Sequence, residues 1–87
     1  MMFTKDPDAV LDYLIDWTRW LASDKIATSA WIVPSGLTNV GDSKAATTAT
    51  VWLAGGTAGQ SYTVTNRITT TGGRTEDRSI IIRIEER

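Results

Sequence analysis

Alternation of hydrophobic and polar positions is clearest in the second half of the chain. Successive side chains of a β-strand point to opposite faces of the sheet, so every second residue shares a face. Residues 47–54, 61–70 and 78–85 follow this period of two, and we expect each of them to form a strand. The side chains expected to face the core are Ala49, Val51, Leu53, Tyr62, Val64, Asn66, Ile68, Ile80, Ile82 and Ile84.

Glycine-rich segments separate these three strands. Residues 55–60 hold three glycines, which adopt the positive φ angles of tight reversals at little cost. A second turn is predicted at residues 71–74, and residues 75–77 are expected to lengthen that loop. No helix is needed anywhere after residue 23.

The pattern between residues 9 and 23 fits two structures. Apolar residues at helical spacing, from Val10 to Leu21, would suit a single N-terminal helix. The same segment also alternates, and its β-branched and aromatic content around residues 13–17 favours a strand. We therefore expect a strand at about residues 11–17 and a helical turn at residues 18–23, with the single helix as the alternative.

The remaining elements are short. Residues 1–8 contain Pro7 between aspartates and are expected to form an arm without regular structure. Residues 25–33 are predicted to form a strand in which Trp31 faces the core. A turn follows at residues 34–36, and then come a short strand at residues 37–40 and a polar loop at residues 41–44.

Together these elements predict one all-β domain. Short strands separated by turns are typical of an immunoglobulin- or fibronectin III-like β-sandwich, here of about six to seven antiparallel strands. We expect residues 1–8 to be the N-terminal arm and residues 9–87 to be the sandwich domain.

Composition narrows the possible functions. Nine basic and ten acidic residues give a formal net charge of −1, which is not the footprint of a nucleic-acid-binding protein. The chain has no cysteine and no histidine, which excludes Ser-His, Cys-His and zinc sites built from those residues. The absence of cysteine indicates either a reducing compartment or stability drawn from assembly. No signal peptide or membrane-spanning stretch is visible, so we expect an intracellular product without a membrane partner.

The sequence offers only weak candidates for a catalytic, metal-binding or phosphate-binding site. Asp12 and Asp16 near Trp17 could be drawn as a glycosidase pair, but a solvated strand face explains them more simply. Asp6, Asp8 and Asp12 could supply oxygen ligands to calcium, without a complete loop pattern. The glycine loop lacks the lysine of a phosphate-binding loop. We expect no catalytic residue, no cofactor and no metal.

The segment GTAGQSYTV resembles the corresponding part of fibronectin III-like sandwiches. There a tyrosine opens a strand, and its hydroxyl bonds the backbone of the preceding crossing loop, an arrangement called the tyrosine corner. Gly59, Tyr62 and Val64 would take these structural positions. The alternative is an ordinary strand tyrosine.

Four residues are candidates for a protein interface. If Val51 and Leu53 face inward, Trp52 points outward, and Ile81 likewise lies opposite the inner isoleucine row. Exposed aromatic and aliphatic groups, with Arg67 and Arg83 for charge pairing, are typical of an interaction surface. The alternative is that the N-terminal segment with its own tryptophans, at positions 17 and 20, folds over them.

Nearly the whole chain resembles one family of small structural proteins of tailed phages and prophages, the fiber-tail adaptor-like proteins. The resemblance rests on KDPDAVLDY, AWIVPSGLT and above all WLAGGTAGQSYTVTNRITTTGGRTEDRSI. It implies an Ig-like fold and a non-enzymatic structural role in the virion, at the tail or connector, with assembly in the host cytoplasm. Other phage structural proteins would be the partners, in several symmetric copies. The alternatives are a capsid decoration protein and a carbohydrate- or cell-surface-binding module.

Overall fold

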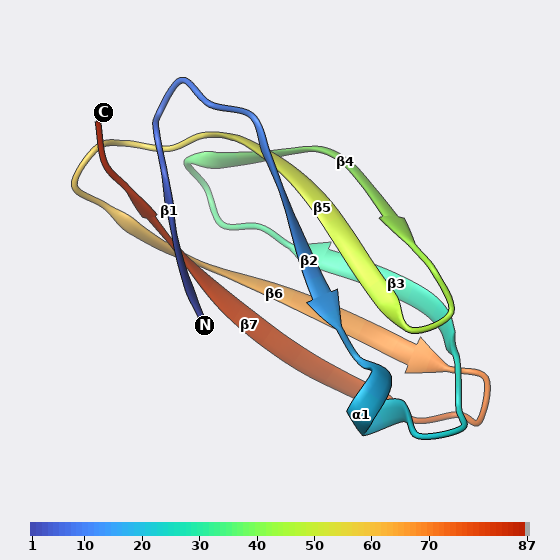
Figure 1. Ribbon diagram of the computed structural model, residues 1–87. Coiled ribbons are helices and arrows are strands. Elements are labelled where there is room, and N and C mark those ends of the chain that lie inside the picture. The colour runs from blue at the N-terminus through green and yellow to red at the C-terminus, as the bar shows by residue number, and fades with distance from the viewer. Residues whose placement is uncertain (87) are drawn as a thin grey trace.

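The computed structural model describes residues 1–86, which form seven strands and one short helix (Figure 1). The elements are β1 (Met2–Lys5), β2 (Leu11–Asp16), α1 (Thr18–Leu21), β3 (Ile26–Ile32), β4 (Leu37–Lys44), β5 (Thr48–Gly55), β6 (Ser61–Thr70) and β7 (Thr75–Ile84). The strand at residues 11–17 with a following helical turn is therefore confirmed, and the single N-terminal helix is not found.

The strands form two sheets that pack face to face. One sheet has the order β1-β7-β6-β3, and the other has the order β2-β5-β4 (Figure 1). Each sheet supplies one apolar face to a shared core, which is the layer arrangement of a sandwich. The predicted all-β, Ig-like fold is confirmed.

The core consists of the predicted inner rows with additions from the N-terminal half. Val51, Leu53 and Val64 are fully buried, as are the isoleucines at 68, 82 and 84. Burying a side chain of this size contributes roughly 1.5–3 kcal/mol. Further buried hydrophobic residues come from β2, α1 and the strands that follow: Tyr13, Ile15, Trp17, Leu21, Ile26 and Leu37.

The N-terminal segment is more ordered than its sequence suggested. Residues 2–5 form β1, which pairs in parallel with residues 81–84 of β7. The prediction of an N-terminal arm without regular structure is therefore wrong for these residues, and so is the prediction that all strands are antiparallel. Phe3 packs its ring 5.0 Å from that of Tyr13, measured between centroids. Lys5 is fully buried, and its Nζ donates to the carbonyl oxygens of Asp6 and Gly55 at 2.9 and 2.7 Å. Pro7 only prevents the strand from continuing.

Two predicted loops are strands. Residues 41–44 continue β4, because they pair with residues 49–52 of β5 beyond an irregularity between Asn39 and Gly41. Residues 75–77 belong to β7 and pair with residues 67–69 of β6. Residues 75–77 lack hydrophobic alternation, but polar contacts between the strands, such as that between the Thr69 and Thr75 hydroxyls, support their pairing. Strand pairing thus extends past the segments whose own pattern predicts it.

Candidate protein-interaction surfaces

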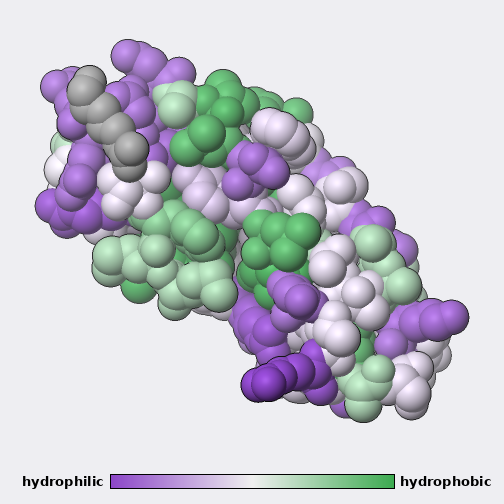
Figure 2. Space-filling model, in the orientation of Figure 1, coloured by the Kyte–Doolittle hydropathy of each residue, from purple (hydrophilic) through white to green (hydrophobic). Residues whose placement is uncertain are grey.

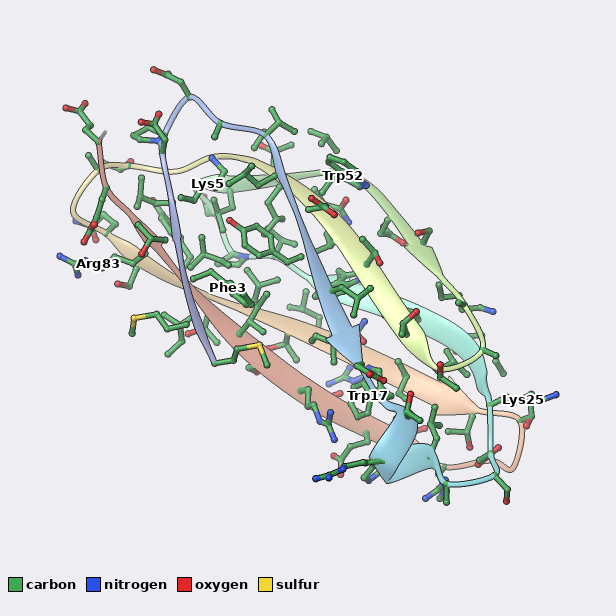
Figure 3. The ribbon with its side chains drawn as sticks, viewed as in Figure 1. Phe3, Lys5, Trp17, Lys25, Trp52 and Arg83 are labelled. Carbon is green, nitrogen blue, oxygen red and sulfur yellow. The ribbon has the colours of Figure 1, made fainter. Side chains whose placement is uncertain are left out.

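The outer face of the three-stranded sheet carries an exposed tryptophan. Trp52 lies in β5 between Asp12 of β2 and Gly41 of β4, and 45% of its surface is exposed. Its neighbours Val51 and Leu53 are fully buried, so the alternation of β5 sends Trp52 outward (Figure 3). Gly41 has no side chain to cover the indole ring.

Two more exposed apolar side chains flank Asp12, the cross-strand partner of Trp52, along the chain. Val10 and Leu14 are 52% and 49% exposed, and both are two residues from Asp12, the cross-strand partner of Trp52. Leu14, which lies in β2, is a diagonal neighbour of Trp52 and is within reach of its large aromatic side chain, whereas Val10 immediately precedes β2. Figure 2 shows hydrophobic groups on this side of the molecule among polar ones. We call the surface formed by Val10, Asp12, Leu14 and Trp52 the Trp52 face.

The other tryptophans of the N-terminal half do not cover this surface. Trp17 lies in the interior of the sandwich and is fully buried (Figure 3). Its Nε1 donates to Oδ1 of Asn66 at 2.9 Å. Trp20 packs edge-on against Trp17, and the guanidinium of Arg74 lies 4.3 Å from the centre of its ring. The alternative in which this segment folds over Trp52 is therefore not what the structure shows.

The other three interface candidates lie on a different surface. Ile81, Arg67 and Arg83 all belong to the four-stranded sheet. Ile81 is 36% exposed and has Met2 of β1 as its strand partner. The four predicted residues consequently do not form one site.

Both arginines on that sheet are already paired within the chain. Arg67 binds the carboxylate of Asp77 through Nε and one terminal nitrogen, at 2.8 and 2.9 Å. This hydrogen bonding raises the pKa of Arg67 and lowers the pKa of Asp77. Arg83 donates to Glu85 at 2.8 Å. These side chains remain about half exposed, but a partner would have to compete with the internal carboxylates.

The predicted structural residues lie at the end of the sandwich and in its core. The hydroxyl of Tyr62 accepts a hydrogen bond from the Thr57 amide at 3.1 Å, which is the backbone contact of a tyrosine corner. Gly59 has a φ of +86° and donates from its amide to the Ile84 carbonyl at 2.8 Å. Val64 is buried, and Trp31 packs partly buried against the core.

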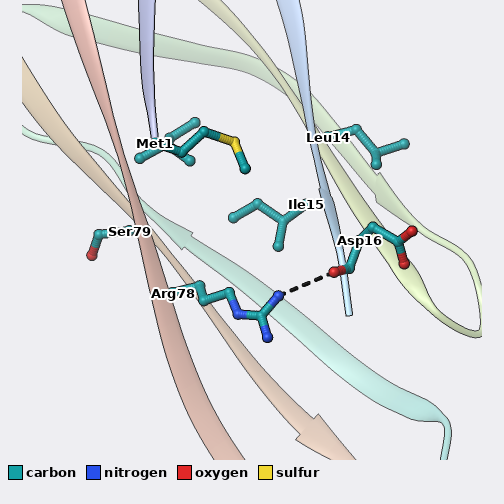
Figure 4. Close-up of a pocket in the computed structure, with 7 residues that line it drawn as sticks. Met1, Leu14, Ile15, Asp16, Arg78 and Ser79 are labelled. Carbon is teal, nitrogen blue, oxygen red and sulfur yellow. Dashed lines mark hydrogen bonds between the residues drawn. The ribbon is translucent and has the colours of Figure 1, made fainter. Parts of the chain in front are cut away.

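A hollow of about 400 Å³ lies between the sheets beside β7 (Figure 4). Arg78 spans it: its side chain donates to the Asp16 carbonyl oxygen at 3.1 Å and lies 4.5 Å from the Trp17 ring centre. The lining residues are Met1, Leu14, Ile15, Asp16, Arg78, Ser79 and Ile80. Sequence reasoning missed this site, because it forms between segments about 60 residues apart in the chain.

The carboxylates weighed for chemistry do not come together as a reaction site. Asp12 and Asp16 share a strand face four residues apart, about 13 Å at the usual strand rise, and a glycosidase pair requires roughly 5–10 Å. Asp16 accepts hydrogen bonds from the Thr18 hydroxyl and amide, which lower its pKa. Within residues 1–86, no group of three or more acidic side chains is positioned to hold a metal ion. No helix in that range is long and apolar enough to cross a membrane.

Comparison with known proteins identifies both a family and a fold. Residues 5–83 match the protein family described as podophage GP4 fiber-tail adaptor protein gp77. Among solved structures, the chain is similar to the solution structure of the PKD domain from KIAA 1837 protein. The TM-score is 0.58 and the identity 20%, over 98% of this chain and 78% of that chain. At this identity the likeness shows the fold alone. No curated protein matches the chain.

Proposed function

Because the chain belongs to the podophage GP4 fiber-tail adaptor gp77 family, a family of phage tail structural proteins, we propose that it is a non-enzymatic adaptor of the virion. In this role it would join other tail, connector or fiber proteins and be present in several symmetric copies. It would be assembled in the host cytoplasm and remain in the particle. The sandwich would serve as a rigid frame that holds binding surfaces in fixed positions.

The exposed Trp52 face is the observation that carries this proposal. Tryptophan is enriched at the centre of protein interfaces, because it buries a large area with few rotatable bonds. Here the ring is framed by two exposed aliphatic side chains and by the carboxylate of Asp12. An apolar centre beside polar groups is the usual composition of an interface.

Truncating Trp52 to alanine tests the proposal. The side chain is half exposed and points away from the core, so we expect the variant to keep its thermal midpoint. Loss of an interface tryptophan typically costs about 2 kcal/mol, a roughly thirtyfold weaker contact. Incorporation of the variant into tails, measured by particle composition after infection or by co-purification with neighbouring tail proteins, should fall accordingly.

Ile32→Ala provides a matched control. Ile32 is 48% exposed at the end of β3, on the other sheet, and its truncation should leave incorporation unchanged. Equal incorporation of the Trp52 and Ile32 variants would contradict the proposal. Normal incorporation combined with lost binding to a host polysaccharide would instead favour the carbohydrate-binding module, in which the indole ring stacks on a sugar.

A further inference from the structure

One strand edge of the four-stranded sheet is only half covered. β1 covers only residues 81–84 of β7. The hydrogen bond from the Ile81 amide to the Met1 carbonyl, at 2.9 Å, marks the end of this pairing. Residues 75–79 of β7 pair with β6 on one side and have no strand on the other within the described chain. An uncovered edge of this kind presents unpaired amides and carbonyls to another chain.

The backbone groups that face outward on this edge can be assigned. Amide and carbonyl of one residue point to the same side of a strand, and the side alternates along the chain. Since the Ile81 amide points toward β1, the backbones of Thr75, Asp77 and Ser79 point the same way. In the isolated chain the Asp77 amide donates to the carboxylate of Glu76 at 3.0 Å. In the isolated chain an outward-facing donor of this edge is thus satisfied by the exposed side chain of a neighbouring residue.

Three other edges, those of β3, β4 and β2, are less suited to pairing with an identical copy. β3 and β4 each contain a register irregularity, and such bulges disfavour edge-to-edge pairing. β2 carries only acidic charges, Asp12 and Asp16, so two copies of this strand would repel each other. The pairing of β7 with β6 is regular throughout, and its free part reads Thr-Glu-Asp-Arg-Ser, with charges of both signs.

We propose that two copies of this chain associate through this edge, antiparallel and centred on Asp77. Glu76 of each copy then lies opposite Arg78 of the second copy, and Thr75 lies opposite Ser79. The inference deepens the proposal of several symmetric copies and rests on it. Its partner is a second copy of the same chain, and its interface is isologous, so the same residues contribute from both sides.

The charges of Glu76 and Arg78 favour this pairing register over the two registers shifted by one residue in either direction. Shifting the centre by one residue toward the N-terminus would place Glu76 opposite Glu76 of the second copy. Shifting it the other way would place two copies of Arg78 together and require Ile81, whose amide is already bonded to β1. In the proposed register, Glu76 and Arg78 form the pairs without mutual backbone hydrogen bonds, which bring side chains closest.

The central Asp77 pair is also compatible with this arrangement. Each Asp77 is already bound in a two-pronged contact by Arg67 of its own chain, so the centre of the interface is a cluster of two cations and two anions. Arg78 uses one nitrogen for the Asp16 carbonyl and retains further donors for a carboxylate (Figure 4). The arrangement requires the Glu76–Asp77 hydrogen bond to break, because the Asp77 amide then binds the second copy.

Sedimentation equilibrium of the purified protein over a range of concentrations tests this inference. We expect a reversible monomer–dimer equilibrium in the wild type. Glu76→Arg and Arg78→Glu should each raise the dimer dissociation constant by at least about tenfold, because both symmetric pairs become repulsive. An equimolar mixture of the two variants should restore a 1:1 dimer, since one variant then presents two arginines and the other presents two glutamates.

Two further variants separate this result from folding defects and general charge effects. Asp42→Arg makes the same charge change as Glu76→Arg on β4 and should leave the dimer intact. Ser79→Pro removes one outward amide that β6 does not use, together with the hydroxyl contact of Ser79 to Thr65 of β6, and should weaken the dimer even if Arg78→Glu fails to fold.

A wild type that stays monomeric, or equal effects of Asp42→Arg and Glu76→Arg, would overturn the inference. The charges would then serve only to protect the edge from pairing. The Trp52 experiment measures incorporation into tails, so its outcome does not depend on this one.

Discussion

At the scale of single residues, the notable feature is a buried polar network in an apolar row. Asn66 lies on the inner face of β6 and is fully buried. Its Oδ1 accepts from Trp17, and its Nδ2 donates to the Ser29 hydroxyl and the Ala30 carbonyl at 2.9 and 3.1 Å. A buried amide is tolerated only when it is bonded in this way. The network links the helical turn, β3 and β6, and so fixes Trp17 in the core.

Replacing Asn66 with alanine should destabilise the fold. The indole Nε1 of Trp17 would remain buried without its acceptor, which costs about 1–3 kcal/mol, and the vacated volume adds a cavity term. Urea unfolding followed by tryptophan fluorescence measures the change. Thr63→Ala, at an exposed position of the same strand, should change the free energy of unfolding by less than about 0.5 kcal/mol. Similar effects of both changes would show that the network contributes little.

At the scale of elements, the crossing from β5 to β6 depends on close contacts between a tyrosine and glycines. Gly36 packs so tightly against Tyr62 that an added Cβ would lie 2.7 Å from the ring, and its φ is +106°. Gly56 likewise has a φ of +103° and no room for a Cβ beside Ile84. Together with the Tyr62–Thr57 hydrogen bond, these contacts hold one end of the sandwich closed.

Removing only the hydroxyl, in Tyr62→Phe, tests the tyrosine corner at this end. The ring and its packing remain, while the Thr57 amide loses its acceptor, so we expect a loss of about 0.5–1.5 kcal/mol. Hydrogen exchange of the Thr57 amide should also become faster. An unchanged exchange rate and an unchanged midpoint in urea would indicate an ordinary strand tyrosine.

At the scale of the whole molecule, a cluster around Asp24 ties the two halves of the chain together. Its carboxylate accepts from the Thr71 hydroxyl, the Gly72 amide and the Arg74 guanidinium, so the loop before β3 is joined to the β6–β7 turn. Arg74 also donates to the carbonyl oxygen of Leu21 in α1. Hydrogen bonds from the Thr70 hydroxyl and then the Lys25 amide lower the pKa of Asp24 well below its ordinary value of 3.8.

This lowered pKa predicts a loss of stability in acid. The folded state favours the charged carboxylate, so its stabilising contribution is complete above pH 3.8 and is lost as the pH falls below that value toward the folded-state pKa. The pKa values of Asp16 and Asp77 are lowered in the same direction. Asp24→Asn should therefore be less stable than the wild type at neutral pH and lose less stability on acidification. Thermal midpoints measured across that range check both expectations.

Asp42→Asn is the matched control for this experiment, because Asp42 is an exposed carboxylate of β4 outside the cluster. It should keep the acid dependence of the wild type. High salt should weaken the contribution of Asp77, whose side chain is 41% exposed, more than that of Asp24, whose side chain is only 15% exposed. An Asp24→Asn variant with an unchanged pH profile would mean that the cluster does not couple protonation to folding.

The sequence by itself determined the strands with clean alternation and the faces of their side chains. In β5, β6 and β7 the period of two is a local property, so the burial of Val51 and Val64 and the outward position of Trp52 follow from neighbours along the chain. The turn glycines and Tyr62 were recognisable for the same reason, since the conformations and contacts they require involve adjacent segments.

Only the tertiary structure decided which strands pair and in what register. β1 exists because it pairs with a strand about 80 residues away, and residues 41–44 and 75–77 are strands because their partners are. The burial of Lys5, the pairing of Arg67 with Asp77 and the uncovered half of β7 follow from that register. The pairing of two distant segments produces no hydrophobic period in the sequence of either one. The uncovered strand edges could therefore be identified only from the tertiary structure.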